Sequence, residues 1–272
     1  MLYTDKTALI SGASSGIGAE FARQLHALGA NVILVARREE ALGQLARELN
    51  NKRQDSAAYM VVDLTQEIAD REGSIQELLR LMSETRIDIL INNAGRGSFG
   101  LYDDLDIDKE IDQLTLNVAA SMRLAHAVIP QMKKRHHGAI VQISSIAGFQ
   151  PIPYMATYAA TKAFNLFHAL ALRHELKPFG ISVLAVCPGP TATEFGGVAR
   201  VPGTSTGLAR DDVQMVVKKS IAALTRNRAI VFPGLRASLV SLVPRLLPIN
   251  VSTWFMKRLL DKTYRKSIPG KR

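Results

Sequence analysis

Tyr158 and Lys162 are the residues of this chain best suited to acid–base chemistry. Lys162 follows Tyr158 by four residues within an alanine-rich helical pattern from Ala156 to Phe179, so the two side chains share one helix face. A free tyrosine titrates near pH 10, and an ammonium that favoured the phenolate by about three units would bring it near neutral pH. The pair therefore predicts proton transfer at an oxygen atom, with Lys162 lowering the pKa of Tyr158.

A glycine-rich turn near the start of the chain predicts a phosphate site. Glycines occur at positions 12, 16 and 18, between an apolar run at Thr7 to Ser11 and a helical stripe that ends near Gly29. Glycine allows a tight turn and a close approach of the backbone, and a helix N-terminus offers N–H groups and a partial positive charge. This strand–turn–helix pattern is typical of a site for the pyrophosphate of a dinucleotide.

The elements that must position these residues form an alternating pattern of strands and helices. The predicted strands are Thr7 to Ser11, Val32 to Ala36, Ala58 to Val62, Ile87 to Ile91, Ala139 to Ser144 and Ile181 to Cys187. Helical patterns fill the intervals, including a long stripe from Leu114 to Met132 that suits a core or a subunit contact. Short apolar strands separated by helices predict an α/β fold, a single-domain Rossmann-type doubly wound parallel sheet with helices on both faces.

We expect one dinucleotide-binding and catalytic domain over residues 1–234, followed by an extension over residues 235–272. No repeat or linker interrupts the first part. The stretch from 190 to 210 is rich in glycine and proline, which is typical of a mobile segment beside a site.

The motifs taken together resemble the short-chain dehydrogenase/reductase family over roughly residues 5 to 232. They are the G-x-x-x-G-x-G turn, Asn92-Asn93-Ala94-Gly95, Ser145, Tyr158-x-x-x-Lys162 and Pro188-Gly189, in this order. The resemblance implies a nicotinamide-dependent oxidoreductase that interconverts a carbonyl and an alcohol, with Tyr158 exchanging a proton with the substrate oxygen and Lys162 also holding the nicotinamide ribose.

The resemblance implies two further catalytic residues. Ser145 matches the serine that hydrogen-bonds the substrate carbonyl, and Ser144 is the alternative, although Ile146-Ala147-Gly148 favours Ser145. Asn117 matches an asparagine that binds a water between the lysine and solvent, with a purely structural polar role as the alternative.

The resemblance also implies the cofactor site. It assigns cofactor contacts to Gly12, Ser14, Ser15, Gly16, Ile17, Gly18, Asp63, Leu64, Asn93, Ala94, Gly95, Tyr158, Lys162, Pro188, Gly189, Thr191 and Thr193. At the end of the second strand, Ala36 replaces the acid that would bind the ribose of NAD, and Arg37 and Arg38 follow. A guanidinium pairs well with a phosphate, so NADP(H) is preferred over NAD(H), although the glycine turn carries no basic residue.

Charge and composition exclude several other functions. The net charge is +10, but residues 235–272 hold nine basic residues against Asp261 alone, which places +8 in the extension and +2 in the rest. The extension has no nucleic-acid motif, so nucleic-acid binding is not predicted.

Neither the histidine spacing nor the acidic run from Asp103 to Glu110 fits a metal site, and that run instead suits a helix start. A single cysteine, Cys187, and an immediate first strand favour the cytoplasm.

The extension leaves several partners open. It is apolar and then basic, with Pro244 and Pro248 inside, so it suits a cap on the substrate cleft, a membrane interface, or a contact with an acidic partner such as an acyl carrier. A cap would imply an apolar substrate. The resemblance implies a homodimer or homotetramer. Two alternative functions remain, a non-catalytic NADP(H)-sensing module and a carrier-bound 3-oxoacyl reductase.

Overall fold

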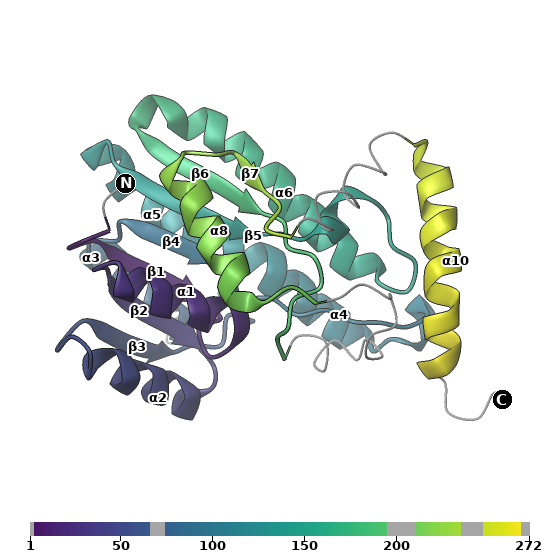
Figure 1. The fold of residues 1–272 in the computed structure, drawn as a ribbon, viewed down its shortest axis with the longest axis horizontal. Helices are drawn as coiled ribbons and strands as arrows, with labels where there is room; N and C mark the ends of the chain where they lie inside the picture. The colour runs from purple at the N-terminus through teal and green to yellow at the C-terminus, as the bar shows by residue number, and fades with distance from the viewer. Residues whose placement is uncertain (1–2, 66–73, 195–209, 235–246, 268–272) are drawn as a thin grey trace.

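A computed structural model describes residues 3–65, 74–194, 210–234 and 247–267 of the chain. Its centre is a seven-stranded sheet with the strand order β3-β2-β1-β4-β5-β6-β7, and every neighbouring pair is parallel (Figure 1). The order reverses beside β1, as in a doubly wound fold. The predicted fold class is therefore confirmed, and the carboxyl ends of the strands all meet at one edge of the sheet.

The strand positions follow the apolar runs of the sequence closely. The strands are β1 (Thr7–Ser11), β2 (Asn31–Ala36), β3 (Ala57–Val61), β4 (Ile89–Asn92), β5 (Gly138–Ile143), β6 (Ile181–Val186) and β7 (Ile230–Val231). Five of the six predicted strands shift at one or both ends by one or two residues, and β7 was not predicted because two residues carry no periodicity.

The helices cover both faces of the sheet. They are α1 (Gly16–Ala27), α2 (Glu39–Asn50), α3 (Ser74–Glu84), α4 (Ile107–Leu114), α5 (Ser121–Arg135), α6 (Ala156–Leu176), α8 (Val213–Thr225) and α10 (Ile249–Ser267). One core cluster joins the sheet to α1, α2 and α8, and a second joins its other face to α3, α5 and α6. Side chains alternate between the two clusters along each strand, so β1 sends Ile10 to the first and Leu9 to the second.

One expectation about burial was wrong, and one predicted helix departs from regular geometry. The run that forms β3 was predicted to be buried, but Tyr59 and Val61 are 43% and 41% exposed because β3 is an edge strand. The long middle stripe was predicted as one helix that suits a core or a subunit contact, and a π-helical turn (Thr115–Ala120) lies within it between α4 and α5. The wider turn rotates the pattern, so Leu114 and Met122 are exposed while Met132 is buried.

The start of α4 and the C-terminal extension were the subject of further predictions. Asp106 caps α4 by accepting hydrogen bonds from the backbone of Asp108 and Lys109, which confirms the helix-start role of the acidic run. Most of the 190–210 stretch that was expected to be mobile, namely residues 195–209, lies outside the described residues, as do residues 235–246 of the extension. Figure 1 shows α10 beyond the carboxyl ends of the strands. Among the helices described, none has the length and apolar character needed to cross a membrane.

Candidate active site

The glycine turn needs its glycines for two separate reasons. Gly12 and Gly16 have φ angles of +65° and +55°, in the left-handed region that side chains with a Cβ disfavour. A Cβ at Gly18 would instead overlap the carbonyl oxygen of Gly12. The turn therefore folds tightly onto the first turn of α1, leaving its backbone close to any ligand at the helix N-terminus.

Asn93 and Ser11 hold the glycine turn against the end of β4. The Asn93 Nδ2 donates to the carbonyl oxygens of Ser11 and Gly12 at 3.0 and 3.1 Å. The Ser11 hydroxyl oxygen accepts the backbone N–H groups of Asn93 and Ala94, both at 3.0 Å. The Ser11 hydroxyl was not predicted as functional because nothing in the sequence distinguishes it from any other strand residue. Asn93 and Ala94 thus shape the site through the glycine turn.

The N-terminus of α1 fits a phosphate group. Ser15 occupies the N-cap position without a side-chain hydrogen bond to the helix, and the first turn holds no acidic residue. Ile17 follows within this first turn and packs against the core. An uncapped, positively polarised helix end beside a glycine turn suits a pyrophosphate.

Arg38 is the arginine that contacts the glycine turn. Its Nε donates to the Ser14 hydroxyl at 3.2 Å, and its Nη1 lies 2.9 Å from a Glu194 carboxylate oxygen. Glu194 follows β6, so Arg38 joins two segments that are far apart in the sequence. Glu194 was not predicted, since no local pattern indicates this pairing.

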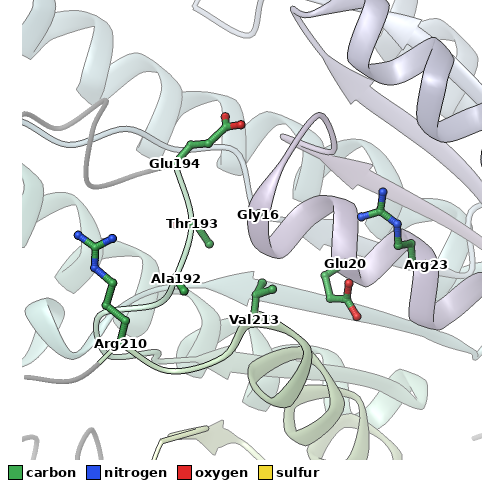
Figure 2. Close-up of a pocket in the computed structure, with 8 residues that line it drawn as sticks. All are labelled: Gly16, Glu20, Arg23, Ala192, Thr193, Glu194, Arg210 and Val213. Carbon is green, nitrogen blue, oxygen red and sulfur yellow. The ribbon is translucent and has the colours of Figure 1, made fainter.

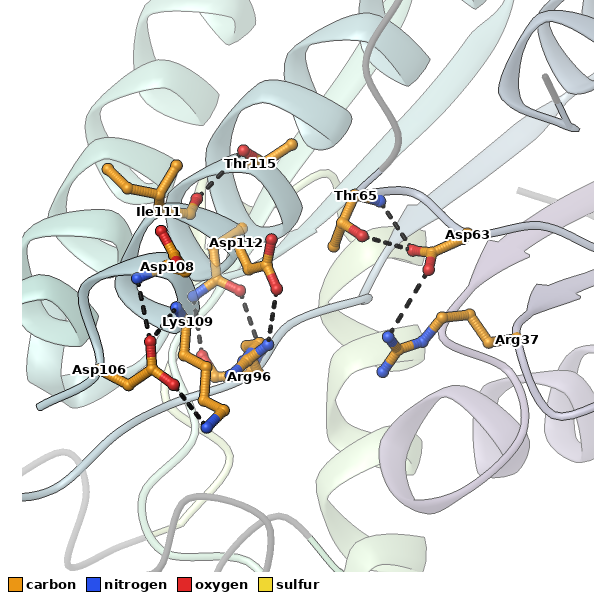
Figure 3. A network of polar contacts seen from close by, with 11 residues as sticks. Arg37, Asp63, Thr65, Arg96, Asp106, Asp108, Lys109, Ile111, Asp112 and Thr115 are labelled. Carbon is orange, nitrogen blue, oxygen red and sulfur yellow. Dashed lines mark hydrogen bonds and ion pairs between the residues drawn. The ribbon is translucent and has the colours of Figure 1, made fainter. Parts of the chain in front are cut away.

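Arg37 turns instead toward the end of β3. Its Nη1 lies 3.8 Å from the Asp63 carboxylate, whose other oxygen accepts the backbone N–H and hydroxyl of Thr65 (Figure 3). The neighbouring Leu64 is 3% exposed and packs in the core, so its backbone alone is available to a ligand. Both arginine side chains are more than half exposed, at the place predicted for the 2′-phosphate.

The segment after β6 lies across the glycine turn. Thr193 is so close that a Cβ on Gly16 would meet its methyl group at 3.0 Å. The Thr191 hydroxyl donates to the Gly189 carbonyl at 3.0 Å, and the Pro188 carbonyl accepts the N–H of Ile146 at 3.1 Å. These contacts bring Pro188, Gly189, Thr191 and Thr193 to the same sheet edge as the glycine turn.

A surface hollow of about 480 Å³ adjoins this segment. It lies between α1, residues 192–194 and the start of α8, with Gly16 and Thr193 on its inner wall and Glu20, Arg23 and Arg210 around it (Figure 2). Its lining comes from the glycine turn and its surroundings and does not include Tyr158 or Ser145. The hollow therefore adjoins the glycine turn rather than the surroundings of Tyr158.

Ser145 and Tyr158 meet through their hydroxyl groups. Ser145 follows the end of β5 and also accepts the N–H of Ala147 at 3.1 Å, which fixes its side chain. Tyr158 is in the first turn of α6, and its hydroxyl is hydrogen-bonded to Ser145. The alternative residue, Ser144, donates instead to the Lys162 carbonyl at 2.7 Å and so fixes the backbone of α6. The geometry favours Ser145 as the residue beside Tyr158.

Lys162 is buried one turn after Tyr158. Its ammonium donates to the carbonyl oxygen of Ile143 at 3.0 Å and lies 5.8 Å from the centre of the Tyr158 ring. Gly95 borders the ammonium, because a Cβ there would lie 3.4 Å from the Lys162 Nζ and 3.1 Å from the Asn117 Oδ1. Burial lowers the pKa of Lys162 to about 8, a change only partly opposed by Cys187.

The expected lowering of the Tyr158 pKa is not what the structure shows. Burial raises the pKa of Tyr158 to about 12, and the hydrogen bond with Ser145 lowers it by less. The physical reason is desolvation: the phenolate would lose its water, while the Lys162 ammonium is directed at Ile143 rather than at the phenol. The expectation from spacing was therefore wrong for this state of the protein.

The Asn117 side chain hydrogen-bonds two other segments of the chain, at Arg96 and at Thr161. It lies in the π-helical turn, is fully buried, and its Oδ1 accepts the N–H of Arg96 at 2.9 Å. Its Nδ2 donates to the Arg96 carbonyl and the Thr161 hydroxyl, each at 2.9 Å. The side chain is thus used in structural hydrogen bonds, which agrees with the alternative interpretation.

Apolar side chains surround Tyr158 on the side away from the sheet. Tyr158 belongs to a buried cluster with Phe99, Ile152 and Leu260, against which Met256 packs. Leu260 and Met256 come from α10, although about a hundred residues separate them from Tyr158. The extension therefore supplies part of the wall around the phenol.

Polar contacts fix α10 in this position. The Tyr154 hydroxyl is hydrogen-bonded to the Asp261 carboxylate, which also pairs with Lys257 at 3.0 Å. Tyr264 stacks on Tyr154 and its hydroxyl donates to Asp104 at 3.2 Å. Asp261, the single acid of the extension, is thus used to hold α10 to the segment before Tyr158.

Comparison with known proteins assigns this architecture to a family. The family model described as short chain dehydrogenase matches residues 6–224. The chain belongs to the short-chain dehydrogenase family. It is therefore an oxidoreductase that binds NAD(P) on a Rossmann-type fold.

Individual short-chain dehydrogenases are similar over most of the chain. A structure from Sphingobium yanoikuyae in complex with NADPH is 36% identical, covers 88% of this chain and 93% of its own, and gives a TM-score of 0.80. A bulky-bulky ketone specific alcohol dehydrogenase from Comamonas testosteroni is 33% identical over 88% of this chain and 92% of its own, with a TM-score of 0.75. A very-long-chain 3-oxoacyl-CoA reductase of Meyerozyma guilliermondii is 36% identical over 65% of this chain, which spans 54% of that protein.

Proposed function

We propose that this short-chain dehydrogenase is an NADP(H)-dependent reductase that converts an apolar ketone or aldehyde to an alcohol. The observation that carries the proposal is the hydrogen bond between Ser145 and Tyr158, one helical turn from the buried Lys162 and inside an apolar cluster. A protein that only senses a nucleotide has no need of this set, so we favour the enzyme over a binding module.

Each of these side chains has a distinct task. The Ser145 hydroxyl donates a hydrogen bond to the substrate carbonyl oxygen and orients it toward Tyr158. Tyr158, whose pKa burial raises to about 12, is protonated at neutral pH and donates its proton to the same oxygen. A nicotinamide held at the cofactor site would supply the hydride to the carbonyl carbon. The Lys162 side chain, when protonated, stabilises the phenolate that Tyr158 becomes, and it would also hold the nicotinamide ribose of a bound cofactor.

The two arginines after β2 support the preference for NADP(H). Ala36 offers no carboxylate at the strand end, while Arg37 and Arg38 are exposed there. Arg38 is hydrogen-bonded to Ser14, so its guanidinium lies beside the glycine turn, where both could contact one phosphate group. The similar Sphingobium structure is described as a complex with NADPH.

The lining of the site supports an apolar substrate. Phe99, Ile152 and Leu260 pack around Tyr158, and α10 contributes directly to this wall. We infer that residues 235–272 act as an extension that caps the substrate cleft of a domain formed by residues 1–234. A bulky ketone is one fitting substrate. A 3-oxoacyl thioester is the second candidate, favoured by the name of the Meyerozyma relative.

We also propose a homodimer or homotetramer. Met122 on α5 and Phe167 on α6 are 44% and 67% exposed, so both helices present large apolar side chains at the surface. The shared packing of α5 and α6 on one face of the sheet makes a joint contact feasible.

The test is NADPH oxidation with bulky aryl ketones, aldehydes and 3-oxoacyl-CoA esters of increasing chain length. Tyr158→Phe removes the proton donor, and we expect kcat to fall by roughly a hundredfold or more with any accepted substrate. Tyr102→Phe, at an exposed tyrosine, is the matched control. Full turnover by Tyr158→Phe would refute the catalytic assignment.

A further inference from the structure

The outer face of α10 exposes an unusual density of large apolar side chains. In the described part of the chain, sixteen large hydrophobic residues are exposed, and six of them lie between positions 247 and 259. Trp254 and Phe255 are 57% and 56% exposed, and Val251 is 46% exposed. Concentration in one short stretch separates these residues from the singly exposed apolar side chains that any protein carries.

Basic side chains continue the same stripe along the helix. Positions 251, 254, 255, 258, 262 and 265 recur at helical spacing and are all exposed, whereas Ser252, Leu260 and Thr263 on the opposite side are buried. The first half of the stripe is apolar, and the second half is Arg258, Lys262 and Arg265. We call the six residues from Val251 to Arg265 the outer stripe.

Within the part of the chain that the structure describes, the direct contacts that hold α10 to the protein come from its other side. Leu260 and the stack of Tyr264 on Tyr154 anchor the opposite side of the helix. Asp261, the single acid of the extension, is bonded to Tyr154 and Lys257. The helix is therefore fixed in orientation, with its apolar and basic residues held outward together.

We propose that the outer stripe docks this protein onto an anionic lipid surface. Apolar side chains would enter the boundary between headgroups and acyl chains, and the cations would contact the lipid phosphates. The Arg258 guanidinium lies 4.9 Å from the centre of the Trp254 ring, so a cation and an interfacial aromatic already sit side by side. The helix would lie on the surface rather than span it, in accord with the lack of a spanning helix among the described residues.

The charge of the outer stripe favours an anionic lipid surface over a second copy of the chain as its binding partner. A two-fold contact through the outer stripe would bring Arg258, Lys262 and Arg265 of both copies into one interface without an acid on the stripe to pair with them. An anionic surface is complementary to the same residues. The proposal does not depend on the substrate, although the inner side of α10 contacts the Tyr158 cluster and would place the cleft close to the lipid.

Trp254 makes the experiment direct because it is the single tryptophan of the chain. The full chain is mixed with phosphatidylcholine vesicles with and without phosphatidylglycerol, and sedimentation and tryptophan emission are recorded. We expect binding and a blue shift with the anionic vesicles, quenching of Trp254 by brominated lipid, and release by salt. No shift and no sedimentation with anionic vesicles would overturn the proposal.

Two pairs of variants separate the charge from the apolar contribution. Lys262→Glu with Arg265→Glu should lower the vesicle partition coefficient at least about tenfold, because each cation near the surface contributes roughly fivefold. Arg47→Glu with Lys218→Glu, on α2 and α8, changes the net charge equally and should lower it far less. Val251→Ser with Phe255→Ser should abolish the blue shift, whereas Tyr59→Ser on the remote β3 should not.

Circular dichroism and the solution mass complete the test. All variants change exposed residues, so their spectra and masses should match the parent protein. If the outer-stripe variants instead reduce the oligomer mass while the parent fails to bind vesicles, the stripe is a contact between copies and the lipid proposal is wrong. Equal weakening by both charge pairs would also contradict it, because binding would then depend on net charge alone.

Discussion

The ring of Tyr264 stacks on the ring of Tyr154, with centroids 4.6 Å apart and planes inclined by 13°. Tyr264 belongs to α10 and Tyr154 lies four residues before Tyr158, so this contact connects the C-terminal extension to the segment that presents the proton donor. The position of α10, and with it the wall contributed by Leu260, depends on this pair.

Loss of the stack should therefore affect large substrates more than small ones. Tyr264→Ala removes an aromatic contact of about 1 kcal/mol, so we expect kcat/KM for a bulky ketone to fall about fivefold, with a smaller change for a small ketone. Tyr264→Phe keeps the stack and is the control. Equal losses with both ketones would show that α10 does not form the substrate wall.

The burial of Lys162 predicts a pH dependence. Burial lowers its pKa to about 8, so the ammonium is present below that pH and is lost above it. Tyr158, with a pKa of about 12, remains protonated throughout the accessible range. We expect kcat/KM for NADPH, which reports groups of the free enzyme, to be level at low pH and to decrease above about pH 8.

The control for this profile is Lys162→Met, which should give a low kcat/KM with no break at the same pH. A plateau in the parent enzyme that extends to the ordinary lysine pKa, about 10.4, would contradict the effect of burial.

The cofactor preference should depend on both arginines after β2. Arg37→Asp and Arg38→Asp each place a carboxylate where a 2′-phosphate is expected, and we predict a decrease of about tenfold or more in kcat/KM for NADPH relative to NADH. Arg47→Asp, on the exposed side of α2, should leave the ratio unchanged. If Arg37→Asp left the ratio of kcat/KM for NADPH to that for NADH unchanged, Arg37 would not be the phosphate-binding residue.

The glycine turn offers a matched pair of stability tests. A Cβ at Gly18 would overlap the Gly12 carbonyl, so Gly18→Ala should lower the free energy of unfolding by about 1–3 kcal/mol and weaken NADP⁺ binding. In Gly43→Ala, on α2, the nearest atom to the new Cβ is 3.5 Å away, and helix propensity should raise stability by up to about 1 kcal/mol. Urea unfolding measures both. A neutral Gly18→Ala would show that the turn can relax.

The sequence by itself determined the sheet and most of the site. Near-continuous apolar strands such as Ile181 to Val186 can be buried only in a sheet covered on both faces, and glycines at 12, 16 and 18 specify a tight strand-to-helix turn. Local spacing also placed Tyr158 and Lys162 on one helix face. These features depend on neighbours along the chain, which periodicity and turn chemistry describe well.

Tertiary structure decided the features that depend on distant residues. The direction of the Lys162 ammonium is set by the Ile143 carbonyl, and the pKa of Tyr158 by burial that includes Leu260 of α10. Likewise, Arg38 meets Glu194 across more than a hundred residues of sequence. Desolvation and long-range pairing depend on which segments the fold brings together. Sequence spacing therefore predicted correctly that Tyr158 lies in the site, but it predicted the wrong direction for the shift of the Tyr158 pKa.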